Sequence, residues 1–261
     1  MPKILLFISL FFCSLTLKAQ TWEIGGGIGG AGYMGDLNQY NPLKISGISA
    51  GAFIKRNFDG YLSARLALNY GTISAADSTS GYAQDRLRNL SFTTSLAEVS
   101  LTGEFNFFEY IPEAGKNKFT PYIFLGVAAL TYKPTTIYRG TKYDLNQYQT
   151  EGQSKPYSTT AFSIPFGAGV KYNIAGKFTL AADIGYRKPN TDYLDDVSGF
   201  YANTSGYAPT AKALADRSGE KTGVYIGSPG SQRGNLDPRD TYFFTQISIS
   251  YTFVTQKCYF H

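Results

Sequence analysis

The feature that most constrains this sequence is a strict two-residue alternation of apolar and polar side chains. In the clearest run, Phe243, Thr245, Ile247, Ile249, Tyr251 and Phe253 share one face, and Phe244, Gln246, Ser248, Ser250 and Thr252 share the other. A two-residue period is typical of a β-strand whose two faces meet different surroundings. The runs over 61–72 and 178–187 alternate in the same way. Each run therefore predicts a strand with one apolar and one polar face.

The same test predicts five further strands, near 22–34, 43–57, 92–108, 119–133 and 159–174, which makes eight in all. The segment 119–133 alternates poorly because both of its faces carry apolar side chains. The segment 22–34 consists largely of glycine and isoleucine.

The connections between these strands alternate in length. The long ones cover 35–42, 75–91, 134–158 and 191–239, and the short ones cover 57–60, 109–118 and 173–177. Antiparallel strands place every second connection on the same side of a sheet. Long loops on one side and short turns on the other are typical of outer-membrane barrels, with the short turns in the periplasm.

Composition supports a membrane barrel over a soluble domain. Charged residues make up 16% of the chain and aromatic residues another 16%, whereas soluble domains carry about 25% charged residues. No stretch after residue 20 is long and apolar enough for a transmembrane helix. Tyrosine and phenylalanine crowd the strand ends, where bilayer interfaces favour aromatic girdles. A soluble β-sandwich is the alternative, but it requires neither feature. We predict an all-β, eight-stranded antiparallel transmembrane β-barrel with long extracellular loops, located in the cell outer membrane.

The first nineteen residues have the pattern of a secretory signal. Lys3 precedes an apolar core over 4–17, and Ala19 offers a small residue for cleavage. A lipoprotein signal at Cys13 is the alternative, but the bulky Phe12 before it argues against one. We expect a signal peptide over 1–19 and a single barrel domain over 20–261. Its strands would lie within 22–253, a C-terminal tail over 254–261 would follow, and both termini would be periplasmic.

A barrel of eight strands has an interior that side chains can fill. If the apolar strand faces meet lipid, four positive and four negative side chains point inward: Lys55, Arg65, Lys171 and Arg187, with Glu23, Glu98, Glu104 and Asp183. Unpaired buried charges are costly, so a balanced set predicts a closed, hydrogen-bonded network that stabilises the fold. A proton or ion path through the interior is the alternative interpretation.

The residue inventory argues against an enzyme. The only histidine is His261, the final residue, so a Ser-His-Asp arrangement has no credible base. No cluster of cysteine and histidine offers a zinc site. Gly25-x-Gly27-x-x-Gly30 matches the dinucleotide fingerprint, but no helix is expected after it. We therefore predict no catalytic residues, cofactor, metal or small-molecule substrate. A secreted chain would also meet no nucleic acid, despite its formal net charge of +5.

The segment 191–239 is too long for a plain connection and is either functional or disordered. Asp192, Asp195 and Asp196 cluster in it, although their spacing misses the calcium-binding EF-hand pattern. We interpret them as solvated turn and capping carboxylates, with calcium binding as the alternative. Residues 209–217 are expected to form a short helix.

Several motifs, in this order and spacing, resemble one known family over most of residues 20–253. Tyr33-Met34-Gly35-Asp36-Leu37-Asn38 follows the glycine-rich first strand and is similar to that family's opening motif. Thr120-Pro121-Tyr122-Ile123-Phe124 is similar to the start of its fifth strand. Asp192-Tyr193-Leu194-Asp195-Asp196-Val197-Ser198 and Arg233-Gly234-Asn235 are similar to the motifs of its last loop. The chain thus resembles the PorG-type outer-membrane β-barrels of Bacteroidota.

This resemblance implies a function that composition does not. It implies a non-enzymatic component of the type IX protein secretion system, set in outer-membrane lipid beside a periplasmic ring of PorK- and PorN-like proteins. In gliding species such a component supports motility. The alternative is a surface-exposed, OmpX/OmpA-like small barrel that acts as an adhesion or interaction protein through its long loops.

The C-terminal tail contains Cys258, the only cysteine left after cleavage of the signal peptide. An odd cysteine in an oxidising compartment predicts either intermolecular pairing or a free thiol. One hypothesis is a disulfide with a ring subunit or a second copy of the chain, and the alternative is an unpaired thiol.

Overall fold

The computed structural model describes residues 21–112, 117–235 and 239–254. The expected signal peptide, the tail beyond Val254 and Cys258 lie outside these ranges. The strands are β1 (Thr21–Met34), β2 (Ile45–Asn57), β3 (Leu62–Ala76), β4 (Ser91–Asn106), β5 (Phe119–Tyr138), β6 (Thr141–Asp144), β7 (Thr160–Ala175), β8 (Phe178–Pro189) and β9 (Thr241–Val254). The helices are η2 (Asp77–Thr79), α2 (Ala83–Arg88), η3 (Leu145–Gln147), α3 (Pro209–Ala215) and α4 (Gly219–Thr222).

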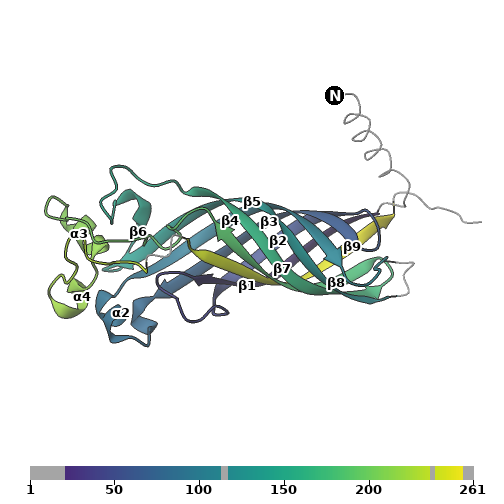
Figure 1. The fold of residues 1–261 in the computed structure, drawn as a ribbon, viewed down its shortest axis with the longest axis horizontal. Coiled ribbons are helices and arrows are strands. Elements are labelled where there is room, and N and C mark those ends of the chain that lie inside the picture. The colour runs from purple at the N-terminus through teal and green to yellow at the C-terminus, as the bar shows by residue number, and fades with distance from the viewer. Residues whose placement is uncertain (1–20, 113–116, 236–238, 255–261) are drawn as a thin grey trace, which may run out of the picture.

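Eight of these strands form a closed antiparallel barrel, which confirms the predicted fold class. The sheet order is β4-β3-β2-β1-β9-β8-β7-β5-β6, and a further pairing between β4 and β5 closes the ring. β1 and β9 pair along their whole length, from Thr21 with Val254 to Met34 with Thr241. Figure 1 shows the strands running obliquely around one long body.

The two ends of the barrel differ. The short connections β2–β3, β4–β5 and β7–β8 lie at one end, together with Thr21 and Val254, and we call this the turn end. The opposite end, which we call the loop end, carries β6 and the helices α2, α3 and α4 (Figure 1). The expected helix over 209–217 is present as α3.

The β5–β6 hairpin differs from expectation, since 134–158 was predicted to be a loop. β5 continues to Tyr138, and β6 pairs back onto it through a tight turn at Arg139 and Gly140. Both turn residues have positive φ, at 48° and 79°, as a two-residue type I′ hairpin requires. The segment 119–133 also alternates in burial in spite of its apolar composition. The apolar residues on its inner face pack in the barrel interior.

Side chains alternate between the outside and the inside of the barrel along each strand. Ile28, Ile48, Leu68, Val127 and Ile247 are among many apolar side chains exposed on the outer face. An exposed aromatic set surrounds the turn end: Trp22, Tyr61, Phe105, Phe107, Phe119, Tyr172, Phe178 and Phe253. The outward series of the last strand departs from this pattern near the loop end, where Thr241 and Phe243 are buried. Phe243 packs on Tyr186.

The interior has two halves. Toward the turn end it is polar, as described below. Toward the loop end it holds a hydrophobic core that includes Tyr33, Phe92 and Phe244 from the strands and Leu194 and Leu214 from the last loop. The loops thus cover the barrel by inserting apolar side chains into it. Within the described residues, no helix is long and apolar enough to cross a membrane.

Candidate functional site

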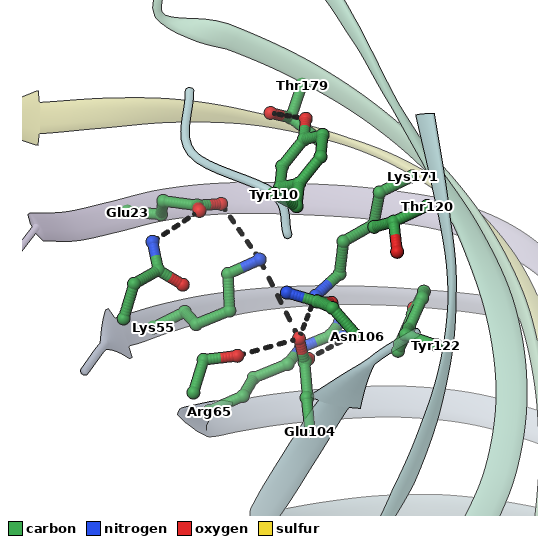
Figure 2. A network of polar contacts seen from close by, with 12 residues as sticks. Glu23, Lys55, Arg65, Glu104, Asn106, Tyr110, Thr120, Tyr122, Lys171 and Thr179 are labelled. Atoms are coloured by element: carbon green, nitrogen blue, oxygen red, sulfur yellow. Dashed lines mark hydrogen bonds and ion pairs between the residues drawn. The ribbon is translucent and has the colours of Figure 1, made fainter. Parts of the chain in front are cut away.

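The polar half of the interior is a network of ion pairs near the turn end (Figure 2). Lys55 on β2 pairs with Glu23 on β1, with 2.9 Å between Nζ and Oε2. Lys171 on β7 pairs with Glu104 on β4 at 2.6 Å. Glu104 also lies 3.7 Å from Lys55 and 3.8 Å from Arg65. Alternation places all of these side chains inside, because each occupies the inward phase of its strand.

A second layer lies nearer the loop end. Arg187 Nε on β8 donates to Glu98 Oε2 at 3.2 Å, and the Tyr242 hydroxyl donates to the same oxygen at 2.6 Å. Arg65, which lies near Glu104, also pairs with Asp183 on β8, since its Nη1 lies 3.6 Å from Asp183 Oδ2. Its guanidinium also stacks 3.9 Å from the ring centre of Phe53.

The structure therefore brings all eight sequence-predicted interior charges inside the barrel, and each positive group lies within ion-pair distance of a carboxylate. Such pairing compensates the desolvation of both partners. Aromatic faces shield the cations further, as Tyr122 does for Lys171 at 4.2 Å. Chemically, this arrangement neutralises charge and fills space.

A second polar cluster covers the loop end and has Arg233 at its centre. We call it the loop knot, formed by Asp36, Arg88, Glu151, Asp196 and Arg233. Arg233 is buried, and its Nη1 donates to Glu151 Oε1 at 2.9 Å and to the Asp196 carbonyl at 2.6 Å. Its Nε donates to the Ala215 carbonyl at 3.1 Å. One side chain thus joins the β5–β7 connection to two distant parts of the last loop.

Arg88, at the end of α2, ties a third loop into the knot. It forms a two-pronged pair with Asp77, at 2.8 Å and 2.7 Å. The same guanidinium donates to the Arg233 carbonyl at 2.5 Å and to the Asp36 carbonyl at 3.2 Å. Bidentate arginine–carboxylate pairs are among the stronger and more directional hydrogen-bonded contacts in proteins.

The first loop joins the knot through Asp36. Its carboxylate Oδ1 accepts a hydrogen bond from the backbone N–H of Asn235. A side chain at Gly234 would place its Cβ 2.8 Å from that oxygen, and one at Gly35 would collide with Asp240 and Tyr33. Both glycines are therefore required by close approach. The resemblance motifs around Asp36 and Arg233, far apart in the chain, meet at this point.

Beneath the knot, three buried carboxylates lie together. Oxygens of Asp36, Asp195 and Asp240 are all within 4.8 Å of one another, the one such acidic group found in the described ranges. The Tyr33 hydroxyl donates to Asp195, and it also lies 3.1 Å from Asp240 Oδ1. Burial and mutual repulsion raise the pKa of Asp195 and Asp240 well above the usual range, and burial raises the pKa of Asp36 to about 6.

Oxygen-only donors are of the kind that calcium prefers, but the protein itself engages these carboxylates. Val197 N–H donates to Asp195 at 2.8 Å, and Leu194 N–H donates to Asp240 at 2.9 Å. Like charges at this distance cannot all be ionised. We therefore interpret the triad as a set of carboxyl groups that retain protons.

The loop carboxylates correct one expectation from sequence. Asp195 and Asp196 were interpreted as solvated, yet both are buried. Asp196 accepts from Thr150 and Tyr157, each at 2.7 Å, and burial raises its pKa to about 6. The reason is that the loop folds back over the open barrel end and does not extend into solvent.

Sequence reasoning missed Tyr33, Arg88, Glu151 and Asp240 as members of these clusters. Two of them carried a usable signal, since Tyr33 is the first residue of the Tyr33–Asn38 motif and Asp240 directly precedes the last strand. Leu37 packs against the hydrophobic core and takes no part in the polar contacts described here.

The glycines of the fingerprint-like segment serve strand packing. Gly25 and Gly27 lie inside β1, and a Cβ on Gly27 would come within 2.7 Å of the Ser248 side chain on β9. A turn and β2 follow β1 where a nucleotide-binding unit needs a helix.

These features define a class: a small closed β-barrel with an apolar outer face, a charge-paired interior and a loop end held together by buried polar contacts. A family model described as a domain of unknown function (DUF6089) matches residues 2–209, and the chain belongs to that family. No curated protein matches the chain.

Three solved structures are among those to which the chain is similar. OprG from Pseudomonas aeruginosa matches at 10% identity and a TM-score of 0.45, over 90% of this chain and 97% of its own. A major outer membrane protein from Thermus thermophilus matches at 12% identity and 0.43, over 90% and 100%. Ail, the attachment invasion locus protein of Yersinia pestis, matches at 12% identity and 0.42, over 90% and 100%.

Proposed function

We propose that this protein is a non-enzymatic structural barrel of the outer membrane, and that it serves the type IX secretion system as a docking point for a periplasmic PorK/PorN-like ring. The observation that carries the structural role is the interior. Inward-facing charged side chains of β1, β2, β4 and β7 pair with one another inside the barrel. A charge-paired, filled interior suits a rigid anchor better than a pore.

The outer surface supports the membrane location. An exposed belt of isoleucine, leucine, valine and phenylalanine surrounds the strands. Large exposed apolar surfaces are rare on soluble monomers, and an apolar band bounded by aromatic residues suits a bilayer. In this orientation the turn end faces the periplasm and the loop end faces outward.

The secretion role rests on the resemblance to the PorG-type family, and the loop knot gives that resemblance a physical basis. Of the matching motif residues, Asp36, Asp196, Arg233 and Gly234 lie in or against the knot. The motifs would then report a shared way of closing the loop end, and the partner would dock at the opposite end.

The turn end offers a surface for such docking. The β2–β3 and β4–β5 turns form a hollow of about 220 Å³, lined by Tyr61, Tyr110 and Ile111 together with Asp59 and Glu109. Its exposed apolar and acidic groups suit a protein partner with a basic, partly apolar surface.

The test is an affinity pull-down of tagged protein from gently solubilised outer membranes, followed by mass spectrometry. We expect ring proteins to co-purify with the wild type and to be lost with Ile111→Lys. Val224→Lys, an equally drastic change at an exposed apolar residue of the loop end, should leave recovery unchanged. A barrel that purifies without ring proteins in all three samples would refute the secretion role.

The alternative role, a surface interaction protein, is favoured by one feature of the loops. Tyr148, Gln149, Gln153, Asn203 and Tyr207 line a hollow of about 620 Å³. Aromatic and amide side chains of this kind suit a polar ligand outside the cell. Deletion of the gene discriminates the two roles, since a secretion component predicts loss of export, whereas an adhesion barrel predicts normal secretion.

A further inference from the structure

A groove runs along the outer face of the barrel over β4 and β5. The strand register aligns outward-facing side chains in rows across the groove. In the first row, Leu68, Val99, Ala129 and Phe162 are successive partners across β3, β4, β5 and β7. Large side chains stand at the two ends of this row, and alanine lies next to Phe162. The hollow measures about 840 Å³, and Phe162 is 72% exposed along its side.

The next row toward the loop end deepens the groove. Here Tyr70, Ala97, Thr131 and Thr160 are successive partners across the same four strands. Tyr70 continues the wall begun by Leu68, and Ala97 continues the small-residue floor. The result is a trough bounded by bulky groups on β3 and β7, with a floor of small side chains along the β4–β5 seam.

This trough changes from apolar to polar along its length. A second hollow of about 450 Å³ shares Tyr70, Ala97 and Thr131 with the first. Its remaining lining includes Ser95 and Lys133 from the strands and Asp144, Asn146 and Gln147 from β6 and η3. The β5–β6 hairpin, which sequence analysis did not foresee, therefore forms a polar end to an apolar groove.

The polar end is positively charged. Lys133 Nζ lies 2.7 Å from Asp144 Oδ2, but the lysine side chain remains 61% exposed. An ammonium group has three donors, so it can bind a further anion. Lys142 is exposed and lies two residues before Asp144 on β6, opposite Ile137 of β5. Two exposed lysines thus lie beside a single aspartate on the β5–β6 hairpin.

We propose that this groove is a binding site for a phosphorylated glycolipid of the outer leaflet, with one acyl chain in the trough and a phosphate at Lys133 and Lys142. The amides of Asn146 and Gln147 suit the sugar hydroxyls. The inference rests on the membrane location proposed above but is independent of the secretion role.

Affinity should come chiefly from the headgroup. Lipid tails are as apolar as the groove, so exchanging one bulk lipid chain for another gains little. Charge-assisted hydrogen bonds to phosphate supply the preference. Removing the lysines should therefore weaken binding, and filling the trough should block it by excluded volume.

The experiment is native mass spectrometry of the purified full-length protein in detergent, titrated with diphosphoryl lipid A. We expect Lys133→Gln combined with Lys142→Gln to weaken binding by about tenfold or more, as loss of charged hydrogen bonds implies. Ala129→Trp should reduce binding to a similar degree. The matched controls are Lys188→Gln and Ala182→Trp on the outer face of β8, both at exposed positions, and they should bind within about twofold of wild type.

Dephosphorylated lipid A and phosphatidylglycerol identify the ligand class. Weak binding of both supports a phosphorylated glycolipid. Equal binding of dephosphorylated lipid A, or tighter binding of phosphatidylglycerol, overturns the proposal, as does lipid retention by the groove variants equal to that of wild type. Membrane fractionation separates the two proposals. A barrel found in the outer membrane that fails the titration refutes only the lipid site, whereas a barrel absent from the outer membrane refutes both.

Discussion

Arg233 is the residue on which the loop end depends most. It is buried and holds Glu151, Asp196 and the Ala215 carbonyl at once. Removing one partner of a buried ion pair leaves the other uncompensated, which costs about 3–5 kcal/mol. We expect Arg233→Ala to open the last loop to protease while the strands stay folded. Arg239→Ala, at an exposed arginine of the same loop, is the control. Similar cleavage rates for the two variants would contradict this role for Arg233.

The acidic residues of the loop end predict a dependence on pH. Burial raises the pKa of Asp36 and of Asp196 from 3.8 to about 6. The folded loops therefore bind more protons than the unfolded ones between these values, so stability falls as pH rises through that window. The raised pKa of Asp195 and Asp240 extends the fall to higher pH.

Hydrogen exchange, corrected for its intrinsic pH dependence, should accordingly show more protection over 190–235 at pH 5 than at pH 8. Asp195→Asn combined with Asp240→Asn should reduce that difference, because the substituted groups no longer titrate and only Asp36 and Asp196 still contribute. Protection that increases toward pH 8 would show that the sign is wrong.

At the scale of elements, barrel closure depends on the last strand. β9 pairs with β1 on one side and β8 on the other, and Ser248 lies at its centre opposite Gly27 and Ala181. Proline lacks the backbone donor that a central strand needs. We expect the folded wild type to migrate faster on unheated gels than after heating, Ser248→Pro to abolish this faster form, and Ser248→Ala to retain it. A folded proline variant would show that closure tolerates a broken seam.

The elements also show what sequence can predict and what it cannot. Alternation located the eight barrel strands, and it placed Glu23, Lys55 and Glu104 inside, because orientation in a strand follows directly from residue parity. The loops obey no such rule. Nothing in the spacing of Asp36 and Arg233 indicates that Arg88 binds the backbone carbonyls of both, since this depends on how the loops fold over the barrel end.

At the scale of the whole molecule, the filled interior predicts a barrel that does not conduct ions. Glu104 is central, since three positive groups lie within 3.8 Å of its carboxylate. We expect no stable currents from the purified protein in planar bilayers. Glu104→Gln should leave the cations poorly compensated and lower the free energy of unfolding by about 3–5 kcal/mol. Glu109→Gln, at an exposed carboxylate near the same end, should have little effect. Sustained open-channel currents from the wild type would overturn the sealed-interior model.

The loop knot constrains how the loop sequences can change during evolution. Residues from all four long connections meet there, near Asp36, Arg88, Glu151 and Arg233, so these loops cannot diverge one at a time. A substitution at Asp36 that lengthens its side chain would have to be matched near Gly234. Among descendants of this gene, such positions should change in concert, whereas the exposed stretches between them are free to vary in length and composition.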